Sequence, residues 1–80
     1  MRENFALIIM ASKTISIQVN GEPRRVDDGT TVAQLLEAME IDNRQLAVEC
    51  NLELVPRGAH ACTVLTEGDR LEIVTLVGGG

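Results

Sequence analysis

Residues 14–26 read TISIQVNGEPRRV, and this stretch decides the fold. Its first half, Thr14–Val19, alternates polar and β-branched residues, which is typical of a strand with one buried face. Asn20-Gly21 follows, and both residues tolerate the positive φ angles that a type I′ hairpin turn requires. Glu22–Val26 is therefore predicted to return as a second strand. Pro23 lacks an N–H for a strand ladder, so we expect it at a sheet edge or a strand end.

An amphipathic helix is predicted over Thr31–Met39, after the turn-forming segment Asp27–Thr30. Apolar residues recur at the spacing i, i+3, i+4 and i+7, which gathers them on one stripe of a helix. They are Val32, Leu35, Leu36 and Met39. Thr31 and Gln34 have the spacing of a capping box, which would satisfy two backbone amides at the helix start. We expect about three turns of helix, ending near Ile41-Asp42-Asn43 because these residues favour loops.

Three more strands are predicted downstream, separated by turns and one ordered loop. The segments are strands at Leu46–Cys50, Glu53–Val55 and Arg70–Leu76, turns at Asn51-Leu52 and Glu67–Asp69, and a loop at Pro56–His60. In the first of these strands alternation points Leu46, Val48 and Cys50 inward. In the last strand alternation alone does not settle which residues face outward: Leu71, Ile73 and Thr75, or Glu72, Val74 and Leu76.

The order of elements is hairpin, helix, strand, short strand, strand. A single helix can bury its apolar stripe only against one face of the sheet. This predicts an α+β protein of the β-grasp (ubiquitin-like) type, in which a small mixed β-sheet packs on one α-helix. The order also fits other α+β folds. We expect one β-grasp domain over residues 13–77, followed by a flexible glycine tail at 78–80.

Residues 1–12 are interpreted as an N-terminal extension outside the domain. Phe5–Ala11 is an apolar run of seven residues, far below the ~20 needed to cross a bilayer. As a signal peptide it is weak, because Glu3 offsets Arg2 and the apolar run is short. The alternatives are a hydrophobic leader, an extra edge strand, or a mis-assigned start with Met10 as the true first residue.

Composition narrows the possible functions. The chain has 12 acidic and 7 basic residues, a net charge of −5, one Phe, and no Trp or Tyr. That charge is the wrong sign for phosphate backbones, and exposed aromatics for stacking on bases are missing, so we expect no nucleic-acid partner. One His and two Cys do not make a four-ligand zinc site. We therefore expect a cytoplasmic protein that is not an enzyme, with no membrane partner and with a basic protein partner.

The two cysteines and the other polar candidates are interpreted as structural. Cys50 and Cys62 form no CxxC motif and are taken as reduced thiols, with Cys50 in the core. Arg24-Arg25 and Arg57 are interpreted as solvated surface, and His60 as a packed or hydrogen-bonded loop residue rather than a catalyst. The acidic pairs at Asp27-Asp28 and Glu67–Asp69 are interpreted as turns, because neither matches a calcium loop.

The terminal Gly78-Gly79-Gly80 is the feature with chemical meaning. Three glycines after a β-forming segment cannot continue the strand, pack a core or cap a helix. Without Cβ atoms, they can thread a narrow channel and bring a free carboxylate into the active site of another protein. The alternative is a frayed end without a function.

Several segments together resemble the ThiS family, the ubiquitin-like sulfur carriers of thiamine (thiazole) biosynthesis. They are Asn20-Gly21-Glu22, Thr31–Leu36, Val55-Pro56-Arg57, Glu67–Val74 and Val77–Gly80. The resemblance covers roughly Lys13 to Gly80. The sequence departs from the family pattern at its added N-terminus, at Leu52, where a small or polar turn residue is usual, and at His60, where an aromatic residue is common.

The resemblance implies a substrate of enzymes with no bound cofactor and no metal. A ThiF-like adenylyltransferase would use ATP to adenylate the Gly80 carboxylate, while Val77, Gly78 and Gly79 thread into its active site. A cysteine desulfurase or rhodanese-type donor would then supply sulfur to form a thiocarboxylate. A ThiG-like thiazole synthase would accept that sulfur. The outward residues of the last strand would form the docking surface.

Three alternatives remain open from the sequence. The chain could be the small subunit of molybdopterin synthase or another pathway-specific sulfur carrier, although the short loops between Ile41 and Glu67 favour the thiamine carrier. It could be a ubiquitin-like protein modifier, for which Lys13, the only lysine, leaves almost no site for chain formation. It could also be a plain β-grasp interaction module.

Overall fold

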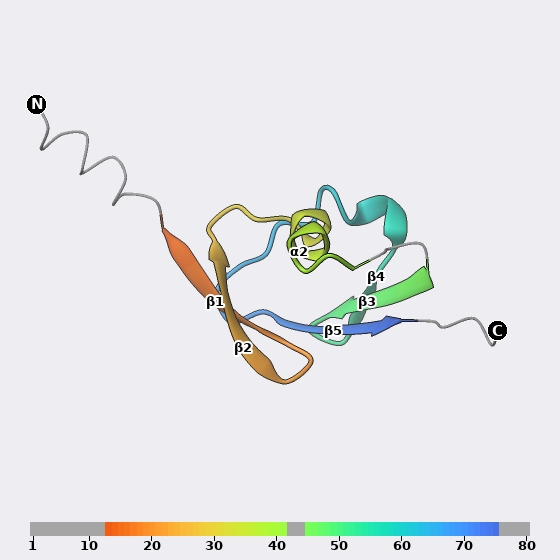
Figure 1. The fold of residues 1–80 in the computed structure, drawn as a ribbon, viewed down its shortest axis with the longest axis horizontal. Coiled ribbons are helices and arrows are strands. Elements are labelled where there is room, and N and C mark those ends of the chain that lie inside the picture. Colours follow the sequence, from red (N-terminus) through yellow and green to blue (C-terminus); the bar gives the residue numbers. More distant parts are fainter. Residues whose placement is uncertain (1–12, 42–44, 76–80) are drawn as a thin grey trace, which may run out of the picture.

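The computed structural model describes residues 13–41 and 45–75 (Figure 1). In chain order the elements are β1 (Thr14–Val19), β2 (Glu22–Asp27), α2 (Val32–Ala38), β3 (Leu46–Cys50), β4 (Glu53–Val55), a 3₁₀ helix (Arg57–Ala59) and β5 (Arg70–Thr75). The predicted strands and the predicted helix are all present. The predicted extension at 1–12, the end of the last predicted strand at Leu76 and the tail at 78–80 lie outside the described residues.

The five strands form one mixed sheet in the order β2-β1-β5-β3-β4. β1 and β5 are parallel, whereas the β1–β2, β3–β5 and β3–β4 pairs are antiparallel. The last described strand in the chain is therefore the central strand of the sheet. The predicted small mixed sheet on one helix is confirmed, and Pro23 lies on the edge strand β2, opposite Gln18.

The hairpin turn has the geometry that its sequence predicts. Asn20 has φ 52° and Gly21 has φ 84°, as a type I′ turn requires. The register follows from this two-residue turn and pairs Val19 with Glu22 and Thr14 with Asp27. That register points Ile15, Ile17 and Val19 of β1 into the core.

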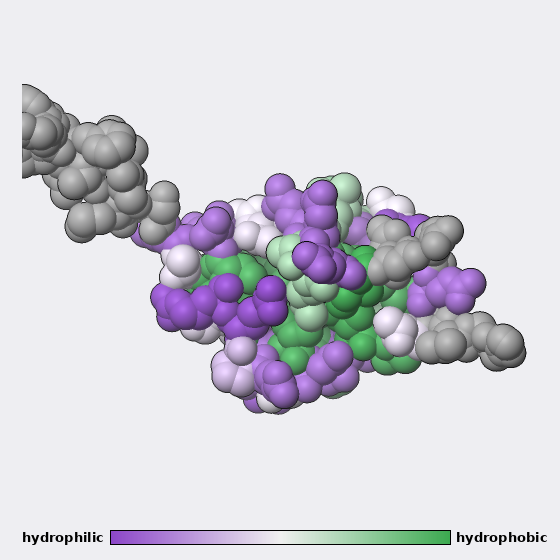
Figure 2. All heavy atoms as spheres, viewed as in Figure 1, coloured by the Kyte–Doolittle hydropathy of each residue, from purple (hydrophilic) through white to green (hydrophobic). Residues whose placement is uncertain are grey.

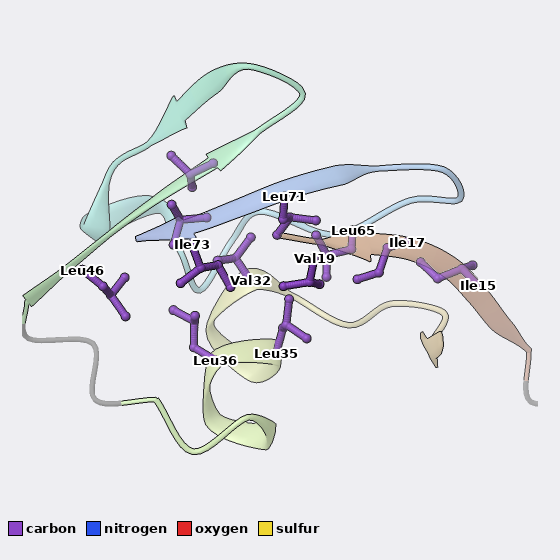
Figure 3. Close-up of a cluster of buried hydrophobic side chains, with 12 residues drawn as sticks. Ile15, Ile17, Val19, Val32, Leu35, Leu36, Leu46, Leu65, Leu71 and Ile73 are labelled. Carbon is purple, nitrogen blue, oxygen red and sulfur yellow. The ribbon is translucent and has the colours of Figure 1, made fainter. Parts of the chain in front are cut away.

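The core is aliphatic and lies between α2 and one face of the sheet (Figure 3). It consists of Ile15, Ile17, Val19, Val32, Leu35, Leu36, Leu46, Val48, Val55, Leu65, Leu71 and Ile73. Met39 and Cys50 are partly buried against this cluster. The predicted helix stripe and the predicted inward residues of β3 are thus on the core side.

The helix is shorter than predicted: it ends after two turns, at Ala38, rather than near Ile41. Glu40 takes a left-handed conformation with φ 58°. Its N–H donates to the Glu37 carbonyl at 3.0 Å, and the Ile41 N–H donates to the Leu36 carbonyl at 3.1 Å. These two bonds form a Schellman motif, which usually has glycine at the left-handed position. A glycine at this position would have predicted the early end, but the residue here is Glu40.

The helix start is closed by its own cap and by the loop after β4. The Gln34 N–H donates to Thr31 Oγ1 at 3.1 Å, and the Thr31 N–H donates to Gln34 Oε1 at 3.0 Å, which confirms the predicted capping box. The next two amides find acceptors in the loop. Val32 N–H donates to the Thr63 carbonyl and Ala33 N–H to the His60 carbonyl, each at 2.9 Å. The helix therefore offers no free amides at its start for a ligand.

His60 holds this loop in place. Its side chain is 4% exposed, and Nε2 lies 3.1 Å from the Val55 carbonyl oxygen. The prediction of a packed, hydrogen-bonded histidine is confirmed. The turn at Asn51-Leu52 is also present, with φ 53° and 72°. Leu52 is 90% exposed, so this departure from the family pattern leaves an apolar side chain in solvent.

Candidate functional site

The candidate site is β5, because this strand runs toward the predicted glycine tail. β5 ends at Thr75, five residues before Gly80. The residues predicted to be activated or threaded, Gly80 and Val77–Gly79, lie outside the described residues. Their roles stay predictions, and the described site is the strand that presents them.

The entry to β5 is fixed by a network of side-chain hydrogen bonds. The Thr66 N–H donates to Asp69 Oδ2 at 2.8 Å, and Asn51 Nδ2 donates to Asp69 Oδ1 at 3.0 Å. Asn51 Oδ1 in turn accepts from the Arg70 N–H at 3.0 Å. Burial alone would raise the pKa of Asp69, but the hydrogen bonds from Thr66, Asn51 and Cys50 together hold that pKa below its usual value. These hydrogen bonds thus fix the predicted turn at Glu67–Asp69, from which the central strand begins.

The first half of β5 is paired on both sides. β1 pairs with it in parallel through Gln18–Arg70 and Val19–Leu71, and β3 pairs with it from Cys50–Leu71 onward. The Asn20 N–H adds a bond to the Leu71 carbonyl at 2.8 Å. Leu71 is 1% exposed. This half is therefore part of the core.

The side chain of Asn20 extends the pairing by one residue. The Ile73 N–H donates to Asn20 Oδ1 at 2.7 Å, and Asn20 Nδ2 donates to the Ile73 carbonyl at 3.2 Å. The amide thus takes the place of a strand residue beside β5, at the point where β1 turns away. Local sequence patterns assign Asn20 only to the hairpin turn, because a contact across 53 residues leaves no local signal.

The structure determines which residues of β5 form its outer face. Leu71 and Ile73 are buried, whereas Glu72 and Val74 point away from the core. Their cross-strand neighbours are Glu49 beside Glu72 and Ala47 beside Val74, and Leu54 of β4 is opposite Glu49. We call these five residues the outer patch. Val74 is 53% exposed and Leu54 is 65% exposed, so the outer patch combines two carboxylates with apolar side chains.

Two carboxylates directly opposite each other repel and weaken a sheet. The repulsion between Glu49 and Glu72 therefore lowers the stability of the isolated domain. A positively charged partner surface would reduce this repulsion. Its position agrees with the expectation of a basic partner that docks on the outward residues of the last strand.

The cysteines do not form a second site. Burial, followed by the nearby Asp69 and Glu53 carboxylates, raises the pKa of the Cys50 thiol and keeps it protonated. Cys62 is exposed, and both thiols are free. Within residues 13–41 and 45–75, no group of three or more His, Cys, Asp or Glu side chains is placed to hold a metal ion. In the same part of the chain, no helix is long and apolar enough to span a bilayer.

A groove lies away from β5, between β2 and α2. Its volume is about 620 Å³, and its wall includes Arg24, Val26, Gln34 and Leu35. Residues of β5 do not line it. Arg25 also lines this groove, and its guanidinium donates to Thr14 Oγ1 and Ser16 Oγ across the hairpin. The described arginines of the hairpin are exposed, as the sequence analysis expected.

The fold and the position of β5 define the class. A small mixed sheet on one helix, with its central strand running toward a C-terminal Gly-Gly-Gly, is the architecture of a ubiquitin-like β-grasp protein. Residues 17–80 match the model of the ThiS family. The chain belongs to the ThiS family. Proteins of this family are carriers rather than enzymes, which confirms that this chain is not itself an enzyme.

Relatives and a solved structure agree with this family. The uncharacterized protein ycf40 of Porphyra purpurea is 37% identical over 71 residues, which are 89% of this chain and 100% of the relative. The thiazole synthase of Paramagnetospirillum magneticum is 42% identical over 66 residues, 82% of this chain but 20% of that protein. The chain thus spans about a fifth of that relative. The structure of the thiamine biosynthesis protein ThiS from Geobacter metallireducens has a TM-score of 0.71 and 33% identity, and the match covers 82% of this chain and 100% of that one.

Proposed function

We propose that this protein is the sulfur carrier of thiazole formation in thiamine biosynthesis. The observation that carries the proposal is the ThiS family match, which runs through the last residue, Gly80. The relatives named thiazole synthase support the thiazole pathway over the molybdopterin alternative, because a segment similar to this chain is part of their length. The solved relative is named as a thiamine biosynthesis protein and supports the same pathway.

The proposed chemistry takes place at the Gly80 carboxylate, in the active site of a ThiF-like adenylyltransferase. The carboxylate attacks the α-phosphate of ATP and releases pyrophosphate, which gives an acyl adenylate. The terminal sulfur of a persulfide on a cysteine desulfurase or rhodanese-type donor then displaces AMP and forms an acyl disulfide. A thiol cleaves the S–S bond, is itself oxidised to a disulfide, and leaves the thiocarboxylate on Gly80.

The chain contributes no catalytic group to these steps. The glycines at 78–80 would thread a narrow channel, because they have no Cβ atoms. β5 would hold the start of that segment in a fixed direction, because it is the central strand of the sheet. A ThiG-like thiazole synthase would receive the sulfur. We expect these steps in the cytoplasm, with ATP consumed by the partner and no cofactor bound to this chain.

The outer patch is the proposed docking surface for these partners. It lies on β5 and its neighbours, directly upstream of the tail, and combines exposed apolar side chains with the Glu49–Glu72 pair. A partner surface with arginine or lysine beside apolar residues would complement it. Replacing Glu72 by Gln should slow association with such a partner, and more salt should reduce the difference.

Intact-mass measurement tests the proposal. The protein is incubated with the ThiF-like enzyme, ATP and the persulfide donor, and the expected product has one oxygen of the carboxylate replaced by sulfur. Deleting Gly80 should abolish the mass change. Gly79→Ala should slow it, whereas Gly58→Ala should not, because a Cβ at Gly58 meets nothing within 4 Å.

Other outcomes separate the alternatives. Conjugates to other proteins without a thiocarboxylate would identify a protein modifier. Thiocarboxylate that transfers to a molybdopterin precursor but not to thiazole synthase would identify the other carrier type. Absence of any adenylation would contradict the proposal and favour a plain interaction module.

A further inference from the structure

The second half of β5 lacks a described strand on its β1 side. In a strand, the backbone N–H and C=O of alternate residues point to the same side, and the next residue points to the other. Toward β1, the Leu71 carbonyl accepts from the Asn20 N–H, and both backbone groups of Ile73 bond to the Asn20 side chain. The next residue with its backbone groups on that side is Thr75. Val74 points to the other side, where it pairs with Ala47 of β3.

The part of the chain that the structure describes supplies no strand beside Thr75 on the β1 side. The pairing of β1 with β5 covers only Gln18–Arg70 and Val19–Leu71, and the hairpin then turns back at Asn20-Gly21. Figure 1 shows β5 running on beyond this hairpin with β3 beside it. The described residues therefore leave a lane the width of one strand beside Thr75, on the β1 side of β5.

The surface of this lane is apolar. Figure 2 shows hydrophobic residues reaching the surface between α2 and β5, beyond the end of the hairpin. Beside the first half of β5, the corresponding space is filled by β1. Alternate side chains of an added strand would point toward this apolar surface, because side chains alternate between the two faces of a sheet.

The other two edges of the described sheet are protected against pairing, whereas this one is not. β2 has Pro23, Arg24 and Arg25 along its edge, and proline and charge are common devices that block strand addition. β4 has only three residues and is followed directly by Pro56. The open half of β5 has neither device, since its residues are Ile73, Val74 and Thr75.

We propose that the open half of β5 binds an extended strand of the activating enzyme, through main-chain hydrogen bonds to the N–H and C=O of Thr75. This inference rests on the proposed function, because it names the mode of recognition by the partner that takes the tail. The partner strand occupies the lane that β1 leaves and has an apolar residue at every second position, facing the core side. Asn20 determines where that strand begins, because its side-chain amide already bonds the backbone N–H and C=O of Ile73.

Amide hydrogen exchange tests the proposal residue by residue. The probe is the adenylyltransferase from the same organism, with ATP, at a concentration that saturates the carrier. The Thr75 N–H should exchange rapidly in the free protein and at least ten times more slowly in the complex. The Val74 and Ile73 amides serve as internal controls, because each is already bonded in the free protein and should change little.

A matched pair of variants tests function. Thr75→Pro removes the N–H, whereas Thr75→Val removes only the hydroxyl and keeps the backbone donor. In ATP–pyrophosphate exchange, Thr75→Pro should raise the KM for the carrier about tenfold more than Thr75→Val does, with little change in kcat. A backbone ester at Thr75, introduced by chemical synthesis, replaces the proline variant if that variant is not folded.

The outcomes distinguish this inference from the proposed function. If the enzyme adenylates the carrier but Thr75 exchange is unchanged in the complex, strand addition is wrong and the carrier function stands. Equal KM values for the proline or ester variant and the valine variant would lead to the same conclusion. If the enzyme does not adenylate the carrier, the proposed function is wrong and this inference with it.

Discussion

The two ends of β5 differ in how they are held, although they belong to one strand. At the entry, Asp69, Asn51 and Asn20 fix the backbone, and β1 and β3 pair on both sides. At the exit, the described part of the chain gives Thr75 a strand neighbour on the β3 side and none on the β1 side. One strand thus serves two purposes. Its first half stabilises the fold, and its second half is left available to a partner next to the tail.

The largest effect should come from the entry half of β5. Leu71→Ala removes a side chain that is 1% exposed in the middle of the aliphatic core. We expect a loss of about 2–5 kcal/mol in the free energy of unfolding, measured by urea denaturation followed by circular dichroism. Val74→Ala on the same strand should change it by less than about 0.5 kcal/mol. Equal losses would contradict the assignment of Leu71 to the core and of Val74 to the outer face of β5.

A smaller effect should come from the boundary between the two halves. Asn20→Gly keeps the positive φ of the turn but removes both hydrogen bonds to Ile73. We expect a loss of about 1–2 kcal/mol in the free energy of unfolding. Asn20→Asp, which keeps an acceptor for the Ile73 N–H, should lose less. Faster exchange of the Ile73 amide in the glycine variant would confirm the cause, and an unchanged rate would contradict it.

A pH titration should sharpen the description of the entry. The pKa of Asp69 is lower in the folded protein than its usual 3.8, so its ionised form stabilises the fold above that value. This contribution is lost as the pH falls through the folded pKa. The stability advantage of the natural protein over Asp69→Asn should therefore be constant near neutral pH and shrink below about pH 4. A constant advantage down to about pH 2 would show that the carboxylate charge has no part in it.

The smallest effect should come from the exit. Thr75→Val changes an exposed side chain on the open half of β5 and should alter the free energy of unfolding by less than about 0.5 kcal/mol. Thermal unfolding measures this change. A large loss would show that the exit is as firmly built into the fold as the entry.

Local patterns predicted most of the fold. The alternation in Thr14–Val19, the Asn20-Gly21 turn and the Thr31–Gln34 capping box each depend on residues within a few positions of one another, so the sequence contains them directly. The early end of α2 was not predictable in the same way, because a left-handed Glu40 is an exception to the glycine rule.

The described site was predicted less completely, because it depends on contacts across the sheet. Alternation could not choose the outward face of the last strand until the register of β5 with β3 was known. The bonds from Asn20 to Ile73 and from Asn51 to Asp69 join residues far apart in the sequence. The roles of Gly80 and of Val77–Gly79 follow from composition and family resemblance, and they stay predictions.

The strand order also has a consequence for synthesis on the ribosome. β5 is the central strand, yet it is the last of the described strands to be made. The helix start depends on carbonyls of His60 and Thr63, so its hydrogen bonds are completed only after these residues have been made. A nascent chain that stops before Arg70 has two separate hairpins without the strand that joins them, and such chains expose apolar surface. The chain can therefore reach its folded state only after β5, the strand directly before the tail, has been translated.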